Sequence, residues 1–255
     1  MINQLMMTII DKKTIAKDTI EMRLAGGAIV RTIEPGQFVH INVGNQGSHM
    51  LRRPISIADI NESDESITII FKVIGSGTED LQSYQIGQEL DVLLPCGSGY
   101  PIKEINVKKA LLVGGGIGVP PLYYLGKKLK ENGVEVESVI GFQTKSSVFY
   151  EQQFAELGAC HVVTDDGSYG WKGYVTDVID QLDFDYYFSC GPTGMLRAVS
   201  NKLENHKGFI SIEQRMGCGI GACYACVVPT NDDEKNGFKK ICKDGPVFRA
   251  NEVVI

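Results

Sequence analysis

Four cysteines near the end of the chain have the chemistry and spacing to hold an inorganic group. Cys218, Cys223 and Cys226 form a C-x4-C-x2-C pattern, and Cys242 follows after fifteen further residues. The first three fit the spacing of plant-type [2Fe–2S] sites, where thiolates hold the cluster. Small residues between them let the backbone wrap closely and turn its N–H groups toward sulfur. We therefore predict that these four thiolates bind a [2Fe–2S] cluster.

A structural zinc ion is the main alternative for this segment, because zinc also takes four thiolates. Zinc ribbons usually pair two C-x2-C knuckles, whereas the segment contains one such pair. A third possibility is that these thiols bind nothing. The remaining cysteines, Cys96, Cys160 and Cys190, are scattered and are interpreted as buried free thiols by default.

The stretch "RRPIS" at 52–56 could hold a phosphate or a flat ring. Arg53 could form charge-assisted hydrogen bonds to a pyrophosphate, and Ser56 would offer a hydroxyl near a flavin ring nitrogen. The turn "KVIGSGT" at 72–78 adds backbone N–H groups that could meet a phosphate. Taken alone, each stretch could also be an ordinary surface strand or turn that binds no ligand.

A glycine-rich loop, "LLVGGGIGVPPL" at 111–122, lies between an apolar strand and a helix, which is where a dinucleotide loop belongs. It departs from G-x-G-x-x-G at Val119 and Pro120, and no acidic residue ends the following strand to take a ribose hydroxyl. A second strand-to-helix turn, "SCGP", places Cys190 and Gly191 at the carboxyl edge of the sheet, where ligands collect. A tight turn without a ligand is the alternative.

Three segments of different character must position these residues. Residues 1–101 contain short strands and frequent turns, which predict a small antiparallel barrel or sandwich. Residues 102–207 alternate strands with helices, which predicts a parallel α/β sheet. Residues 208–255 have too few periodic apolar positions for their own core, so a metal or cluster is expected to stabilise them. Strands are expected within 26–43, 66–78, 86–100, 134–144, 160–167 and 184–192, and helices within 78–84, 119–133, 147–158, 174–182 and 193–207.

Composition excludes several classes of function. The chain has 25 Lys and Arg against 31 Asp and Glu, and this net charge of −6 argues against non-specific nucleic-acid binding. No run of about 18 apolar residues predicts a membrane span. The amino-terminal segment lacks the features of a signal peptide, and seven cysteines without one indicate the reducing cytoplasm.

Together the motifs resemble the ferredoxin–NADP⁺ reductase superfamily, in which a barrel holds FAD and an α/β domain holds the nicotinamide. The order of barrel, nucleotide domain and "RMGCGIGACYACVV…CKDGPVF" resembles, over essentially the whole chain, the electron-transfer subunits of type B dihydroorotate dehydrogenases. The superfamily often has an aromatic residue where Ile55 stands, so no phenol stacks on the flavin there; related flavin subunits share this replacement.

The resemblance implies sites for FAD, for a [2Fe–2S] cluster and for NAD as a substrate. The implied FAD residues are Arg53, Pro54, Ile55, Ser56, Ile70, Phe71, Lys72, Gly77 and Thr78. The implied NAD residues are Gly115, Gly116, Gly118, Cys190 and Gly191. The implied cluster ligands are Cys218, Cys223, Cys226 and Cys242.

The resemblance also implies a role in de novo pyrimidine (UMP) biosynthesis. Electrons would pass from an FMN-containing, dihydroorotate-oxidising catalytic subunit through the cluster and FAD to NAD⁺. A heterotetramer of two chains of each kind is expected, with the cluster domain at the subunit interface. No catalytic base for an organic substrate is evident, since His40, His49, His161 and His206 are scattered and are interpreted as ordinary histidines.

Two other functions fit parts of the sequence. One is a flavin and iron–sulfur subunit that reduces ferredoxin or a sulfur compound with NAD(P)H. The other is a non-enzymatic redox-sensing or zinc-binding module, which metal identity would distinguish. NADP also remains open, because Lys145 follows the second strand of the α/β segment and could meet a 2′-phosphate. A solvated loop lysine is the favoured interpretation.

Overall fold

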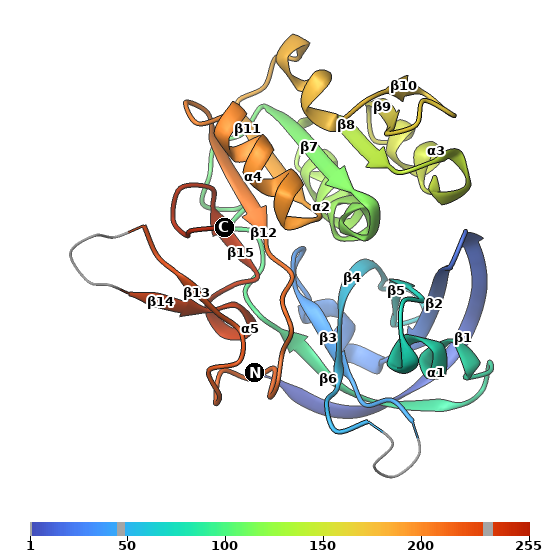
Figure 1. The fold of residues 1–255 in the computed structure, drawn as a ribbon. Helices are drawn as coiled ribbons and strands as arrows, with labels where there is room; N and C mark the ends of the chain where they lie inside the picture. The colour runs from blue at the N-terminus through green and yellow to red at the C-terminus, as the bar shows by residue number, and fades with distance from the viewer. Residues whose placement is uncertain (1, 45–48, 232–236) are drawn as a thin grey trace.

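A computed structural model describes residues 2–44, 49–231 and 237–255. Figure 1 shows a barrel, an α/β domain beside it, and a carboxyl-terminal segment that lies against both. In the described ranges, no helix is long and apolar enough to cross a membrane. The predicted combination of antiparallel barrel, parallel α/β sheet and small carboxyl-terminal domain is confirmed.

The amino-terminal unit is a closed six-stranded antiparallel barrel with the order β1-β2-β5-β4-β3-β6. Alternate residues point inward, so side chains such as Ile57, Ile69 and Phe71 form an apolar core. The helix expected near 78–84 is also present. The elements are β1 (Asn3–Ala16), β2 (Thr19–Ala25), η1 (Gly27–Thr32), β3 (Phe38–Ile41), β4 (Arg53–Asn61), β5 (Ser66–Lys72), α1 (Ser76–Ser83) and β6 (Glu89–Cys96).

The second unit is a seven-stranded sheet with the order β10-β9-β8-β7-β11-β12-β15. Its strands are parallel except β15, which pairs antiparallel with β12. Parallel strands need helical crossovers, which explains the alternating sequence pattern. The elements are β7 (Lys109–Gly115), η2 (Gly116–Gly118), α2 (Val119–Glu131), β8 (Glu135–Phe142), η3 (Lys145–Ser147), α3 (Glu151–Ala155), β9 (Ala159–Thr164), β10 (Trp171–Lys172), η4 (Val175–Asp177), η5 (Ile179–Gln181), β11 (Tyr186–Cys190), α4 (Thr193–Lys202) and β12 (Lys207–Ser211).

The carboxyl-terminal segment has little regular structure of its own. It contains the short hairpin β13 (Val227–Pro229) and β14 (Phe238–Lys240), followed by α5 (Ile241–Asp244) and β15 (Val247–Arg249). Because β15 joins the α/β sheet and Phe38 of β3 packs in one cluster with Cys226 and Cys242, both larger units hold this segment in place. The expected limit at residue 208 falls within β12, a strand of the α/β sheet.

Two expected elements differ from the structure. The helix expected within 174–182 is two short 3-10 turns, η4 and η5. Its β-branched residues disfavour a continuous helix, and Asp177 Oδ2 accepts a hydrogen bond from Tyr174 N at 2.8 Å, which caps a single turn. The first part of the strand expected within 26–43 is the 3-10 helix η1, which directs Val30 into the barrel core.

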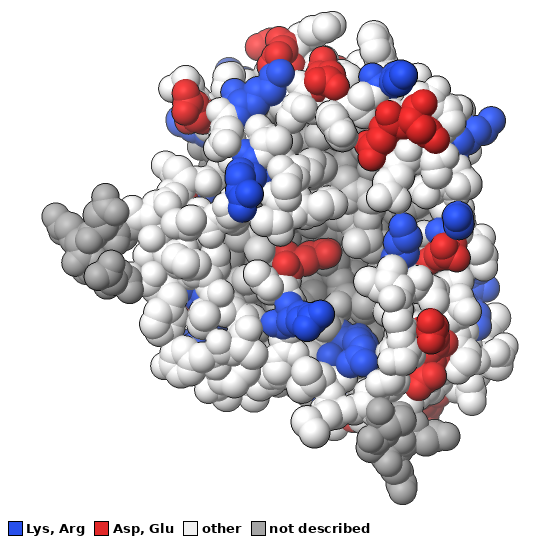
Figure 2. Space-filling model, in the orientation of Figure 1, with Lys and Arg blue, Asp and Glu red and all other residues white. Residues whose placement is uncertain are grey.

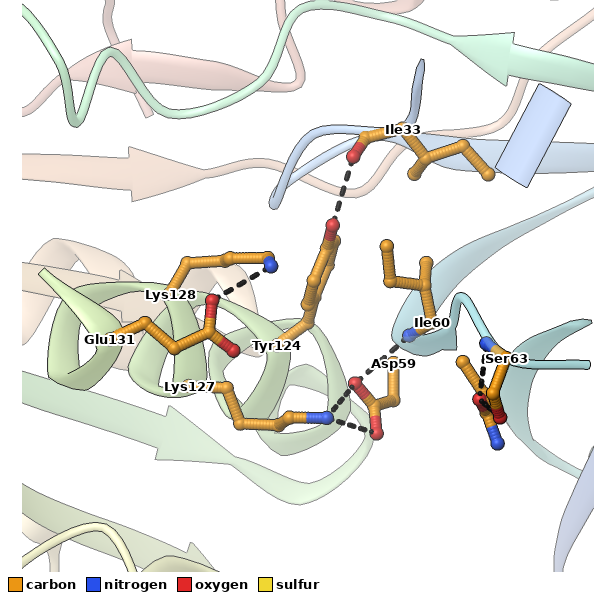
Figure 3. A network of polar contacts seen from close by, with 9 residues as sticks. Ile33, Asp59, Ile60, Ser63, Tyr124, Lys127, Lys128 and Glu131 are labelled. Atoms are coloured by element: carbon orange, nitrogen blue, oxygen red, sulfur yellow. Dashed lines mark hydrogen bonds and ion pairs between the residues drawn. The ribbon is translucent and has the colours of Figure 1, made fainter. Parts of the chain in front are cut away.

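Helix α2 joins the two large units by packing against β4 (Figure 3). Lys127 Nζ lies 2.7 Å from Asp59 Oδ1, and Tyr124 Oη donates a hydrogen bond to the Ile33 carbonyl at 2.9 Å. Burial raises the pKa of Asp59, and the hydrogen bond from Lys127 opposes that rise. These contacts fix the barrel relative to the nucleotide domain.

Candidate functional site

The fold brings the four cysteines of the carboxyl-terminal segment together. The β13–β14 pairing places Val227 opposite Lys240, so Cys226 and Cys242 lie next to each other at one end of the hairpin. A hydrogen bond of 2.9 Å from Ile241 N to the Cys226 carbonyl reinforces this arrangement. The pairing of β13 with β14 therefore returns the fourth thiol to the first three.

Backbone N–H groups point at the cysteine sulfurs. Cys223 N lies 3.3 Å from Cys218 Sγ, Gly221 N lies 3.2 Å from Cys242 Sγ, and Cys242 N lies 3.5 Å from Cys226 Sγ. Burial works to raise the pKa of Cys218, but the N–H groups of Cys223 and Ile220 outweigh it and lower the pKa to about 6. Such N–H groups stabilise anionic sulfur, which is what thiolate ligation of iron requires.

The donor set and its surroundings fit an iron–sulfur cluster. Gly219 and Gly221 have positive φ angles of 70° and 81°, which allow the loop to turn around the sulfurs. A Cβ atom on Gly217 would lie 3.2 Å from Cys223 Sγ, so a larger residue would crowd the thiol. Burial raises the pKa of Cys242 to about 12, with the neighbouring Cys226 contributing. In the described ranges no group of three or more His, Cys, Asp or Glu side chains, these cysteines included, is arranged to hold a single metal ion, whereas a [2Fe–2S] cluster spreads four thiolates over two irons.

The barrel opens at the place where FAD was predicted. The ladder between β4 and β5 runs from the Asn61–Ser66 pair to the Ile57–Ile69 pair and stops there. Within these described strands, residues 53–56 and 70–72 do not pair with each other. Their facing backbone edges can therefore bond to the polar edge of an inserted flat ring.

The predicted FAD residues do not all present side chains to this opening. Phe71 is buried in the barrel core, and Ile70 packs against the core of the α/β domain. These two residues can serve a ligand through their backbone groups. Lys72 instead lines the cavity described below.

Arg53 and Gly77 meet at the first turn of α1. A Cβ atom on Gly77 would lie 2.1 Å from Arg53 Nε, so a larger residue there would displace the guanidinium from this position. Arg53 also contacts His49 Nδ1 at 3.2 Å, and Thr78 Oγ1 accepts a hydrogen bond from Gly75 N at 3.2 Å. A guanidinium beside a helix amino terminus suits a pyrophosphate.

A cavity of about 570 Å³ lies between the barrel and the α/β domain. Figure 2 shows this face hollowed in the middle, with basic side chains on the barrel side. Thr19 and Lys72 line the cavity from the barrel, and Gly115, Gly116 and Met195 line it from the α/β domain. A predicted FAD residue and two predicted NAD residues therefore share one cavity, as transfer between two bound rings requires.

The other predicted NAD residues support the wall of this cavity. Gly118 packs so closely on the β11–α4 turn that a Cβ atom would lie 2.3 Å from the Cys190 carbonyl oxygen. Cys190 is fully buried, and burial raises the pKa of its thiol well above the ordinary value. Gly191 has a φ of 156°, which any side chain would strain.

Two acidic residues near this site were missed by the sequence reasoning. Asp165, directly after β9, is the one acidic residue among the described residues that line the cavity. Glu213 follows β12 and contributes to the raised pKa of Cys190. Both follow the carboxyl ends of sheet strands, and that position was the available signal.

Lys145, considered for a 2′-phosphate, has a different neighbour. Its Nζ lies 5.5 Å from the centre of the Tyr169 ring, and its backbone N donates to Ser168 Oγ at 2.8 Å. It is not among the described residues that line the cavity. The Asp165 carboxylate therefore lies in the cavity wall, whereas Lys145 lies outside the cavity, over the Tyr169 ring.

The carboxyl-terminal segment matches a known family. Residues 213–254 match the model described as the iron–sulfur cluster binding domain of dihydroorotate dehydrogenase B. Over its length the chain is similar to the protein from Shouchella clausii (strain KSM-K16) named dihydroorotate dehydrogenase B (NAD(+)), electron transfer subunit. The two are 49% identical over 252 residues, which covers 98% of this chain and 97% of that one. The same named subunit from Bacillus cereus (strain G9842) is 49% identical over 253 residues, covering 98% of both chains.

Solved structures agree with this similarity. A structure of an NADH-dependent reduced ferredoxin-NADP oxidoreductase, studied for flavin-based electron bifurcation, has a TM-score of 0.87 and 32% identity, covering 98% of this chain and 90% of that one. A cytochrome P450 reductase from Amycolatopsis has a TM-score of 0.69 and 22% identity, covering 80% of this chain and 66% of that one. The second likeness concerns the fold alone.

Proposed function

Because the chain belongs to the family of electron transfer subunits of NAD-dependent dihydroorotate dehydrogenase B, we propose specific residues for each of its cofactors. The four cysteines Cys218, Cys223, Cys226 and Cys242 hold the [2Fe–2S] cluster. FAD lies in the opening between β4 and β5, with its pyrophosphate at Arg53 and the first turn of α1. NAD lies along Gly115 and Gly116. The closeness of the four thiols and their N–H···S bonds is the observation that carries this proposal.

The chain is an oxidoreductase subunit that transfers electrons between its [2Fe–2S] cluster, FAD and NAD. A flavin exchanges electrons singly or in pairs, so it can connect a two-electron nicotinamide to a one-electron cluster. The protein's task is to hold these groups close together and away from water. The contact between α2 and β4 does this for the flavin and nicotinamide sites, because it sets the two walls of the cavity.

An electron transfer subunit requires a catalytic partner, and we propose that this partner contains FMN and oxidises dihydroorotate. The carboxyl-terminal segment offers a surface for it, since Tyr224 and Phe238 are exposed and lie edge to face with ring centres 5.4 Å apart. Ile220, in the cysteine loop, is also exposed. Exposed aromatic and aliphatic side chains are typical of interface centres. A complex of two chains of each kind would place the cluster at the subunit interface.

The division of labour follows the chain order. We propose a barrel at 1–101 for FAD, an α/β domain at 102–207 for NAD and a cluster domain at 208–255, with β12 and β15 joining the last two. Pyrimidine biosynthesis in the cytoplasm is the proposed setting, because dihydroorotate oxidation supplies orotate to that pathway.

Spectroscopy of the pure chain tests the cofactor assignment. An anaerobic visible spectrum, recorded before and after NADH, should show flavin and iron–sulfur absorption that both bleach. Assays on the same sample should give one flavin and two irons per chain. Zinc in place of iron would reject the cluster assignment and favour the non-enzymatic, zinc-binding module.

Reconstitution with the catalytic subunit tests the partner. The isolated chain should oxidise NADH with artificial acceptors but should not oxidise dihydroorotate. Adding the FMN-containing subunit should produce dihydroorotate-dependent reduction of NAD⁺. Oxidation of dihydroorotate by this chain alone would contradict the proposal, and reduction of ferredoxin without any such partner would favour the related reductase function.

A further inference from the structure

His40 is a fully buried histidine at the contact between the barrel and the cysteine loop. It lies on β3, where Val39 and Ile41 point into the barrel core. Because side chains alternate along a strand, Phe38 and His40 share the opposite face. Phe38 packs in one cluster with Cys226, so this face of β3 is covered by the carboxyl-terminal segment (Figure 1). His40 therefore points toward the proposed cluster site.

The imidazole fits closely against Gly219, the residue after the first cysteine. A Cβ atom on Gly219 would lie 2.1 Å from His40 Nδ1 and 2.8 Å from its Cε1. Gly219 also has a φ of 70°, so glycine is required there for space as well as for conformation. This close fit ties the position of the loop to the barrel.

Neither ring nitrogen of His40 has a hydrogen-bond partner among the described residues. Backbone groups of Arg52 and Cys218 lie close enough to the ring to raise its pKa, yet neither makes a hydrogen bond of good geometry to a ring nitrogen. The Arg52 guanidinium is committed to Asp91, with Nη2 2.6 Å from Asp91 Oδ2 and Nη1 2.9 Å from the Asp91 carbonyl. Buried polar groups are rarely left unpaired, so an imidazole without a partner here points to a group that the described residues do not provide.

We propose that His40 donates a ring N–H hydrogen bond to a sulfur of the cluster site, either a bridging sulfide or the Cys218 sulfur. This inference rests on the proposed function, because it requires the cluster at these cysteines. The donor exists in every protonation state, since neutral imidazole carries one N–H and imidazolium carries two. Burial, with the positive charges of Arg52 and Arg53, outweighs the opposing backbone contacts and lowers the pKa of His40 to about 4, so the ring is neutral near neutral pH.

This contact would make His40 a positioning residue that also adjusts the reduction potential. Hydrogen bonds to sulfur stabilise the more negative, reduced cluster, and they are one of the factors that set iron–sulfur potentials. Removing the donor should therefore lower the potential of the cluster while leaving the flavin, which His40 does not serve, unchanged. A cluster with a lower potential holds its electron less strongly, so loss of the donor would favour transfer of that electron from the cluster to the next acceptor.

Variants at His40 test the contact through the potential. In His40→Leu the reduced-to-oxidised ratio of the cluster, followed by EPR at a fixed ambient potential, should fall about tenfold, equivalent to about 59 mV for one electron. His40→Asn, which keeps an N–H near the Nδ1 position, should recover most of that ratio. The flavin potential and the iron content serve as internal controls. Full iron content with an unchanged cluster potential in His40→Leu would reject the role of His40 but not the proposed function.

A measurement on the unaltered chain covers the case in which His40→Leu loses its cluster. Protein labelled with nitrogen-15 only in histidine should show a weak nitrogen coupling in pulsed EPR of the reduced cluster, and His40→Asn should lack it. Absence of that coupling in the unaltered protein would overturn the inference. Absence of iron and sulfide from the unaltered protein would overturn both the inference and the proposed function.

Discussion

The cluster site and the nucleotide cavity are built in opposite ways. All four proposed cluster ligands lie within 218–242, and the N–H···S bonds that join them run inside that segment. The cavity instead takes Thr19 and Lys72 from the barrel and Gly115 and Asp165 from the α/β sheet. One site is local in sequence, whereas the other exists only where two domains meet.

This difference should govern how each site fails. A cluster needs all its thiolates in one geometry, so loss of one should act as an all-or-none change. The cavity depends on the spacing of two walls held by many contacts, so single changes there should have graded effects.

The largest effect is expected at a cluster ligand. Cys226→Ser replaces a buried thiol with a much poorer ligand for iron, so iron content and dihydroorotate-dependent NAD⁺ reduction in the reconstituted complex should both be lost. NADH oxidation with an artificial acceptor should persist, because the cavity is not altered. Cys160→Ser on β9 is the matched control and should keep iron. Normal iron content in Cys226→Ser would remove this cysteine from the ligand set.

A smaller, graded effect is expected at Gly118. Gly118→Ala would place a Cβ atom 2.3 Å from the Cys190 carbonyl oxygen, and relieving that clash should cost about 1–3 kcal/mol of stability. Thermal unfolding should shift down and KM for NADH should rise, while iron content stays normal. Gly194→Ala is the control for the loss of stability, since a Cβ atom there meets nothing within 4 Å, although Gly194 also lines the cavity. If both variants unfolded at the same temperature, Gly118 would not support the cavity wall as proposed.

A change in nucleotide preference is expected at Asp165. A carboxylate in the cavity wall repels the 2′-phosphate of NADP, so Asp165→Asn should improve kcat/KM for NADPH relative to NADH about fivefold, which corresponds to about 1 kcal/mol. Asp166→Asn is the neighbouring control, because Asp166 Oδ1 accepts a hydrogen bond from Ser168 N at 2.9 Å. An unchanged ratio of kcat/KM for NADPH to that for NADH in Asp165→Asn would show that the adenosine ribose does not bind near Asp165.

The smallest effect is expected at the domain junction. Lys127→Met removes the partner of Asp59 and should cost about 0.2–1 kcal/mol near neutral pH, because both side chains are partly exposed. Burial already raises the pKa of Asp59, so the folded state disfavours its ionised form, and loss of Lys127 should raise that pKa further. The stability deficit should therefore grow as pH rises through the pKa of Asp59 and disappear in acid, where Asp59 is protonated.

Urea unfolding of Lys127→Met at several pH values measures this deficit. Lys128→Met is the control, because Lys128 pairs with Glu131 on its own helix at 2.8 Å. A deficit that is independent of pH would show that lost packing, and not the charge of Asp59, explains the change.

The sequence by itself determined the parts whose chemistry is local. The four cysteines, the glycine-rich loop and the "RRPIS" strand could be identified because ligand types and turn residues stand at short, characteristic spacings. The order of barrel, α/β domain and carboxyl-terminal segment could be predicted from hydrophobic periodicity. Periodicity was wrong at 174–182, where apolar β-branched residues pack as two 3-10 turns under the sheet.

Only the tertiary structure decided which distant residues meet. Gly219 has to be glycine because His40, on a barrel strand far away in sequence, occupies the space of its side chain. Phe71 lies in a predicted FAD strand but points into the barrel core, and Asp165 reaches the cavity only because β9 ends at its edge. Such contacts depend on strand register and domain packing, which the spacing of residues along the chain does not determine. Ligation by cysteine depends on residue type and short spacing, so it can be predicted from the sequence.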